Sequence, residues 1–272
     1  MLTDIELHLA YKIGNASINN FPFPHIFVKD VFPNDFYSRI QENLPNNNSM
    51  TSLPDLYPEQ PGFKNYKERF VIDFKKIESI NKIEKNKQDF WNAIGEFFMK
   101  GEFANFLKSK FQNYLDMRFK LISDLSFQSE CLLINDKKNY SLGPHTDSPK
   151  KVISLLIYLP KDFTQKETGT TIYMPKDPNL LNKELPHIHY PHEQFHKVIT
   201  MPFVPNSAFC FIKTNNSYHG VEKLDKEETD RWSLQYNMHI TNETLEKEIA
   251  AKDKHHKEIN TKESKVKSSF NI

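Results

Sequence analysis

Length, composition and charge limit the class of protein. The 272 residues suit one large domain or one domain with a helical extension, and 38% of them are hydrophobic, which excludes a wholly disordered chain. The formal net charge is +1, from 36 basic and 35 acidic residues, so the charge balance favours neither nucleic acid nor an anionic membrane as the main partner.

The N-terminal part of the chain predicts a short strand followed by a helix. Residues 1–24 contain no long apolar stretch, so we expect neither a signal peptide nor a membrane anchor there, and we treat them as a separate N-terminal segment. A strand is expected to begin at His25. A helix through about Leu44 follows it, with Asn34 or Asp35 as the N-cap.

A loop and then a long helical region follow. The stretch that begins at Pro45 is rich in Pro, Asn and Ser, which predicts a loop. From about Asn86 to Leu115 the apolar residues recur with the period of a helix, and one face carries Phe90, Trp91, Ile94, Phe97 and Phe98. An aromatic stripe of this kind is more typical of packing against a sheet than of a ligand groove. We therefore expect the N-terminal helical portion to pack on a sheet.

Short strand-like segments separated by turn signals dominate the chain after about Phe127. They are residues 130–135, 152–159, 170–174, 196–203, 208–212 and 232–240. This order predicts an α+β chain whose second half is a β-sandwich or barrel, with a jelly roll as a candidate. We expect the domain to span 25–241, with its β core at about 127–241. The charged tail, 242–272, is expected to be a frayed helix that passes into disorder.

Cysteine usage favours a reducing compartment. Cys131 and Cys210 both lie in apolar, strand-like runs, where buried thiols are the usual interpretation. Two cysteines do not make a disulfide scaffold. We therefore predict a cytoplasmic protein.

Candidate metal ligands lie in the segment YSLGPHTDSPKKVISLLIYLP. His145 and Asp147 are two residues apart between strand-like runs, so their side chains would point to the same side and offer two ligands to a divalent metal. His219, in SYHGVEKL, offers a third. Two histidines and one carboxylate on one face of an octahedron form the facial triad of non-haem iron(II) oxygenases, which leaves positions open.

An arginine follows the proposed third ligand. Arg231 and Ser233 would share one face of a strand, and a guanidinium with a hydroxyl beside it suits a carboxylate. The distal carboxylate of 2-oxoglutarate is such a group. A surface ion pair of Arg231 with Asp230 or a nearby Glu is the alternative.

The stretch from 131 to 240 resembles the 2-oxoglutarate/Fe(II)-dependent dioxygenase superfamily, in particular its prolyl-4-hydroxylase-like branch. The matching pieces are PHTD, GTTIY, PNSAFCFI, YHGV and RWSLQYN. The resemblance implies a double-stranded β-helix, iron ligation by His145, Asp147 and His219, and a 2-oxoglutarate role for Arg231. It implies no catalytic residue beyond the metal ligands. The implied cofactors are Fe(II), 2-oxoglutarate and O₂, with ascorbate as a candidate addition.

Departures from related patterns narrow the reaction. Collagen-type prolyl hydroxylases commonly have Lys where Arg231 stands and an upstream Tyr where Asp136 or Lys137 lies, so a proline substrate does not follow. Nucleic-acid repair members carry a second Arg shortly after the first, which RWSLQYNMHI lacks. Halogenating members lack the carboxylate ligand, whereas Asp147 is present, so hydroxylation is favoured.

Other polar residues have two interpretations each. Tyr140 and Tyr158 are candidates to hydrogen-bond the co-substrate or orient a ligand, and core tyrosines are equally common. Lys150 and Lys151 suit either an anionic substrate or solvent. A second histidine cluster, made of His187, His189, His192 and His196, is interrupted by prolines, and a loop over the barrel mouth is favoured over a second metal site.

The sequence thus predicts a hydroxylase that releases succinate and CO₂ from 2-oxoglutarate and acts on a small-molecule or peptide substrate. A peptidyl proline, an amino acid, a sugar and a lipid-linked intermediate all fit. Two other classes remain open, a non-catalytic metal-binding jelly-roll sensor and an interaction protein that uses the helical half and the tail. Turnover of 2-oxoglutarate would separate the first of these from an enzyme.

Overall fold

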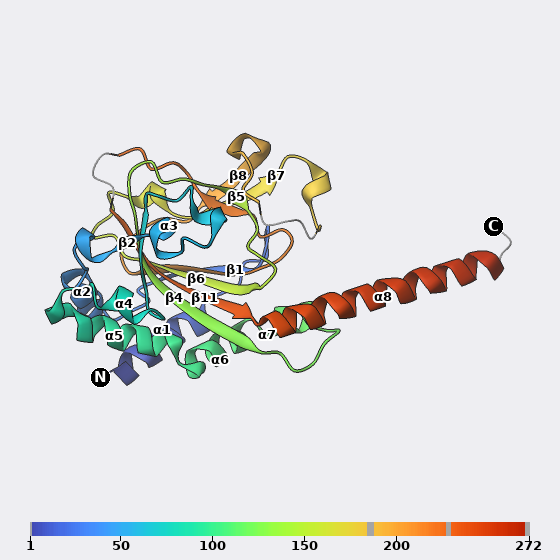
Figure 1. The fold of residues 1–272 in the computed structure, drawn as a ribbon, viewed down its shortest axis with the longest axis horizontal. Coiled ribbons are helices and arrows are strands. Elements are labelled where there is room, and N and C mark those ends of the chain that lie inside the picture. The colour runs from blue at the N-terminus through green and yellow to red at the C-terminus, as the bar shows by residue number, and fades with distance from the viewer. Residues whose placement is uncertain (1, 184–187, 227–229, 270–272) are drawn as a thin grey trace.

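The computed structural model describes residues 2–183, 188–226 and 230–269 (Figure 1). Its helices are α1 (Leu2–Asn15), α2 (Asn34–Glu42), α3 (Leu53–Leu56), α4 (Ile77–Ile80), α5 (Lys85–Met99), α6 (Gly101–Lys110), α7 (Gln112–Arg118) and α8 (Asn242–Ser269). Its strands are β1 (His25–Lys29), β2 (Thr51–Ser52), β3 (Arg69–Asp73), β4 (Phe127–Asp136), β5 (Leu142–His145), β6 (Lys151–Tyr158), β7 (Thr171–Pro175), β8 (Phe195–Thr200), β9 (Ser207–Ile212), β10 (His219–Val221) and β11 (Arg231–Ile240).

Two antiparallel sheets form the core. One has seven strands in the order β1-β9-β6-β11-β4-β3-β2, and the other has four in the order β5-β10-β7-β8. From β4 to β11 the chain passes repeatedly between the sheets, and β11 returns to lie beside β4 and β6. This winding is the double-stranded β-helix, so the predicted jelly-roll fold is confirmed.

Strand β11 shows how the sequence builds the barrel wall. Trp232, Leu234 and Tyr236 face the main hydrophobic core together with residues of α5 and α6. The alternate residues, among them Arg231 and Gln235, face the interior of the barrel and line its cavity. Because side chains alternate along a strand, one sequence segment supplies both the apolar face that holds the helices and the polar face of the site.

Helices cover the outer face of the seven-stranded sheet, as Figure 1 shows below β4 and β11. The predicted aromatic stripe packs there: Trp91 and Phe98 are fully or almost fully buried in the core, and the Trp91 indole Nε1 donates a hydrogen bond to the Asn43 carbonyl at 2.6 Å. The expected packing of the helical portion on the sheet is therefore confirmed. Both cysteines are buried and free within the described residues, as expected.

Local details differ from the sequence predictions. The helical region is three helices, because the backbone at Lys100 is extended (φ −68°, ψ 146°) and α6 ends before Phe111. The N-cap of α2 is Pro33, with no side-chain hydrogen bond, so the expected Asn34 or Asp35 cap is wrong. The expected loop after Pro45 contains β2 and α3.

The charged C-terminal segment forms helix α8, which projects away from the barrel in Figure 1. Its first turns are anchored, since Glu248 is buried and forms an ion pair with Arg118 at 3.2 Å. The domain limits of 25 and 241 stay a prediction. None of the helices in the described ranges combines the length and the apolar character that crossing a bilayer would require.

Candidate metal centre

Three predicted ligands converge at one end of the four-stranded sheet. His145 ends β5 and His219 begins β10, and the two residues are paired across neighbouring antiparallel strands. A Cβ at position 220 would lie 2.3 Å from the Leu142 carbonyl oxygen, so Gly220 permits this close approach of β10 to β5. Asp147 lies beyond the end of β5, in the segment before β6, and so between two strands as predicted.

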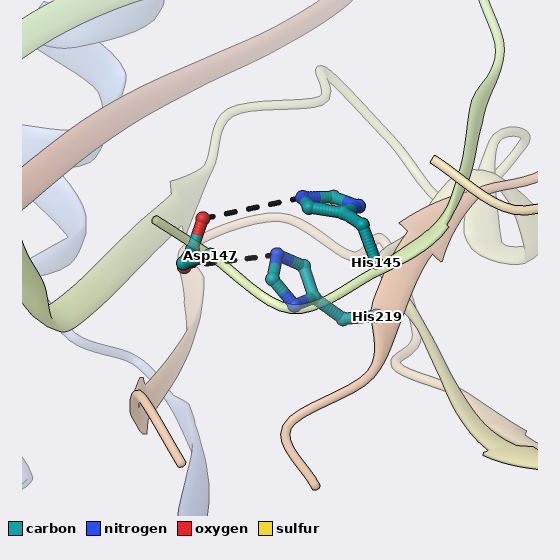
Figure 2. Close-up of side chains that lie close together, drawn as sticks. All are labelled: His145, Asp147 and His219. Atoms are coloured by element: carbon teal, nitrogen blue, oxygen red, sulfur yellow. Dashed lines mark ion pairs between the residues drawn. The ribbon is translucent and has the colours of Figure 1, made fainter. Parts of the chain in front are cut away.

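The three side chains point toward one another (Figure 2). One ligand atom from each of His145, Asp147 and His219 lies within 4.8 Å of the others, and all three residues are buried. The Nε2 atom of His145 is 4.0 Å from Asp147 Oδ1, and the Nε2 atom of His219 is 3.9 Å from Asp147 Oδ2. Among the described residues this is the single group of this kind. The predicted triad is therefore brought together.

Backbone carbonyls set the orientation of both imidazoles. Nδ1 of His145 lies 2.9 Å from the Gly143 carbonyl oxygen, and Nδ1 of His219 lies 2.9 Å from the Ser217 carbonyl oxygen. A carbonyl can only accept, so each Nδ1 carries the proton and each Nε2 keeps its lone pair for a metal. Burial, with the neighbouring His219, holds the pKa of His145 well below its usual value, so the ring is neutral at neutral pH.

Asp147 is held as a carboxylate. Burial alone would raise its pKa, but the positive charge of Lys151 outweighs that effect and holds the pKa well below its usual range. Lys151 Nζ is 2.9 Å from Oδ1, and the Ser154 hydroxyl donates to Oδ2 at 3.1 Å. Lys151 thus contacts a candidate ligand, a role that the sequence interpretation did not assign to it. Two imidazoles, each with Nε2 near the Asp147 carboxylate, and that fixed carboxylate fit the donor set that Fe(II) takes in a facial triad.

Replacing Ser154 with alanine is expected to weaken Fe(II) binding about 10-fold, because outer hydrogen bonds that orient metal ligands contribute on that scale. Equilibrium dialysis against Fe(II) under anaerobic conditions measures the effect. Ser148→Ala is the matched control, since Ser148 also lines the cavity and forms no hydrogen bond with Asp147 among the described contacts. Equal iron affinity in Ser154→Ala and wild type would contradict a supporting role for Ser154.

The triad opens onto a cavity of about 490 Å³ between the two sheets. Polar residues of β11 and β4 form one wall, and an aromatic group from the segment after α3 forms another, with Tyr57, Phe63 and Tyr66. Glu130 accepts a hydrogen bond from the Asn237 amide at 2.7 Å, and His239 Nε2 lies 3.8 Å from Glu130 Oε2. Burial alone would raise the pKa of Glu130, but His239 and Asn237 lower it to about 2. The volume is suited to a small co-substrate together with part of a substrate.

Arg231 lines the same cavity and is 1% exposed. Its Nη1 donates to Asp136 Oδ2 at 2.7 Å and its Nε donates to the Thr168 carbonyl at 2.6 Å, while its Nη2 is buried without a partner. Asp230, the ion-pair partner considered from the sequence, bonds to Lys137 instead. A buried, charged N–H without an acceptor is costly, so this atom fits an anionic ligand.

The structure separates the remaining candidates. Tyr140 lines the cavity, and its hydroxyl is buried without a partner, as is the hydroxyl of Thr170. Ser233 is buried with an unpaired hydroxyl but is not part of the cavity lining, and the Tyr158 hydroxyl accepts from the Thr170 backbone N–H at 3.1 Å. Arg231, Tyr140 and Thr170 therefore present unpaired polar atoms at the cavity, which is the arrangement a bound carboxylate requires.

The second histidine cluster does not act as a unit. His189 reaches the cavity, where its ring centroid is 4.5 Å from that of His145 and its ring bonds to the Tyr66 hydroxyl. His192 lies against Tyr173, and His196 is exposed on β8. His187 lies outside the described residues. A lining role for His189 fits the prediction of a loop at the barrel mouth.

Comparison with known proteins gives structural likeness alone. No family model and no curated protein matches the chain. A Pseudomonas putida prolyl-4-hydroxylase structure is similar over 85% of this chain and 98% of its own, with 12% identity and a TM-score of 0.45. A 2OG-Fe(II) oxygenase family oxidoreductase from Burkholderia pseudomallei is similar over 88% and 90%, with 13% identity and a TM-score of 0.42.

A third solved structure is the non-haem α-ketoglutarate-dependent epimerase SnoN of nogalamycin biosynthesis. It is similar over 88% of this chain and 84% of its own, with 13% identity and a TM-score of 0.44. At these identities and TM-scores the likeness carries no argument about function.

Proposed function

We propose that this protein is a 2-oxoglutarate- and O₂-dependent Fe(II) oxygenase of the prolyl-4-hydroxylase-like branch, which hydroxylates a small-molecule or peptide substrate and releases succinate and CO₂. One observation carries the proposal. His145, Asp147 and His219 converge at a cavity that is also lined by a buried arginine with an unpaired N–H. A metal triad and an anion site in one cavity are the two requirements of this chemistry.

Each protein group has a physical role in the proposal. His145 and His219 would hold the iron through Nε2, because their Nδ1 protons are bonded to backbone carbonyls. Asp147 would be the anionic ligand, supported by the Ser154 hydroxyl. When bound, Fe(II) supplies the activation of O₂ that couples oxidative decarboxylation of 2-oxoglutarate to hydroxylation. Three protein ligands leave room for the co-substrate, which a closed structural site would not.

The second half of the proposal concerns the co-substrate. Arg231 Nη2 would donate to the distal carboxylate of 2-oxoglutarate, and the Tyr140 and Thr170 hydroxyls are placed to donate as well. Burial, against the opposing effect of Arg69, raises the pKa of Tyr140 above its usual value, so the phenol keeps its proton. Ser233 and Tyr158 do not line the cavity and would act indirectly, Tyr158 by holding Thr170 in place. A cytoplasmic location and the absence of nucleic-acid and membrane partners remain predictions.

Succinate formation tests the proposal. Protein reconstituted with Fe(II) and supplied with 2-oxoglutarate and O₂ is expected to release succinate slowly on its own and faster with a substrate. Removal of iron with a chelator should stop succinate release, and added Fe(II) should restore it while Zn²⁺ does not, because Zn²⁺ has no redox chemistry. Peptides, amino acids and sugars are screened as stimulators. Iron-loaded protein that binds 2-oxoglutarate but never forms succinate would favour the non-catalytic sensor.

A further inference from the structure

A second arginine, Arg69, lines the same cavity as Arg231. Arg69 on β3 and Arg231 on β11 occupy the positions directly opposite Asp136 on the strand between them, so the three side chains share one face of the sheet. Both arginines line the cavity. Arg69 precedes the stretch 131–240 that resembles the dioxygenase superfamily, so the resemblance assigned it no role.

The three residues form one ion-pair cluster. Arg69 Nε donates to Asp136 Oδ1 at 2.7 Å and Arg69 Nη2 donates to Oδ2 at 3.0 Å, while Arg231 Nη1 donates to Oδ2 at 2.7 Å. Asp136 is fully buried, Arg231 is 1% exposed, and the Arg69 side chain is 15% exposed. The carboxylate therefore receives three guanidinium N–H bonds, and its acceptor capacity is largely taken up.

The charges of this cluster do not balance. Two guanidinium groups face one carboxylate, and within the described residues neither arginine forms an ion pair with any other acid. One positive charge is left over in a buried place, beside the unpaired Arg231 Nη2 and the unpaired Tyr140 hydroxyl. The Tyr140 ring packs on Arg69, with the guanidinium carbon 4.4 Å from the ring centroid. A buried surplus charge is costly unless an anion compensates it.

We propose that Arg69 is a second cation of the co-substrate carboxylate site, and that Asp136 is a positioning residue that holds both arginines. Asp136 neutralises one of the two charges and directs Arg231 so that Nη2 stays free. The net charge of +1 then matches a single carboxylate, which favours a ligand with an anionic distal end. This inference rests on the proposed function, because it takes the distal carboxylate of 2-oxoglutarate as the anion.

The charge balance predicts the outcome of a double substitution. Arg69→Gln removes the surplus charge. Because the distal carboxylate then loses the attraction of one unit charge, screened by a medium less polar than water, 2-oxoglutarate is expected to bind about 10-fold more weakly to the Fe(II)-loaded protein. Arg69→Gln with Asp136→Asn restores the net charge of +1 through Arg231 alone, and the amide oxygen at position 136 can still accept from Arg231 Nη1, so part of the affinity should return. Arg69→Lys keeps the charge and should bind more tightly than Arg69→Gln.

Anaerobic isothermal titration with 2-oxoglutarate measures these affinities, and 2-oxobutyrate is the matched probe because it lacks the distal carboxylate. A purely structural role for Arg69 would weaken both ligands alike, whereas the proposal predicts an unchanged 2-oxobutyrate affinity. Thermal unfolding and Fe(II) affinity identify any variant that fails to fold, and Arg69→Lys then replaces it in the comparison. Wild-type affinity in Arg69→Gln, or equal loss for both probes, overturns the inference and leaves the proposed function standing. Wild-type protein that binds no 2-oxoglutarate overturns both.

Discussion

Replacing His219 with alanine is expected to remove Fe(II) binding and turnover together. His219 offers one of three buried ligand atoms within 4.8 Å of one another, and Nδ1 is already committed to the Ser217 carbonyl. Loss of an orienting partner alone costs about 10- to 100-fold in metal affinity, so loss of a ligand should cost at least about 100-fold. Anaerobic dialysis followed by iron analysis measures binding, and succinate release measures turnover. His145→Ala should behave in the same way.

The matched control is His196→Ala. His196 lies on β8, is exposed, and is not part of the cavity lining, so its removal should leave one iron per chain and full succinate release. A His219→Ala variant with wild-type iron content and activity would refute the assignment of the ligand. If His196→Ala lost iron and succinate release to the same extent, the effect of His219→Ala would not be specific to the proposed ligand.

Replacing Arg231 with alanine is expected to weaken 2-oxoglutarate binding by about 2–5 kcal/mol, on the order of 30- to several-thousand-fold. The distal carboxylate would lose its charge-assisted hydrogen bond in a buried pocket. Folding should survive, because Asp136 keeps two hydrogen bonds from Arg69. Iron affinity without co-substrate should change little, since Arg231 lies outside the triad. Equilibrium dialysis with labelled 2-oxoglutarate measures the change.

Two variants accompany this experiment. Arg231→Lys should recover part of the loss, because a point charge replaces the planar fork. Arg39→Ala removes an exposed arginine of α2 outside the cavity lining and should bind 2-oxoglutarate as wild type does. Unchanged affinity in Arg231→Ala would remove Arg231 from the site and leave Arg69 as the anchor to test.

The sequence predicted the fold because its strands and helices show in short-range patterns, and it predicted the metal triad because of the residue types. Apolar and polar residues alternate in 232–240, where the structure has β11. An uninterrupted strand-like run covers 152–159, where the structure has β6. The helical period around Trp91 likewise placed the helices on the sheet. His145, Asp147 and His219 were identifiable because a metal restricts ligand type strongly, and few residue types satisfy it.

The second arginine was not predictable in the same way. Arg69 meets Asp136 through the pairing of β3 with β4, across 67 residues of chain, and nothing in the local sequence sets that register. The strand-like sequence RFVID at 69–73 was a usable signal, since its three central residues are β-branched or aromatic. The approach of His189 to His145 depends on the same kind of long-range folding.

The most direct test of the central claim is an anaerobic absorption titration of 2-oxoglutarate into Fe(II)-loaded wild-type protein. Suppose that His145, Asp147 and His219 hold one iron per chain with positions open for the co-substrate. A visible metal-to-ligand charge-transfer band should then grow as 2-oxoglutarate is added and saturate when each iron has bound one 2-oxoglutarate. Neither iron alone nor 2-oxoglutarate alone should produce it. Iron-loaded protein that binds 2-oxoglutarate without developing the band, or that binds it equally well without iron, would contradict the claim.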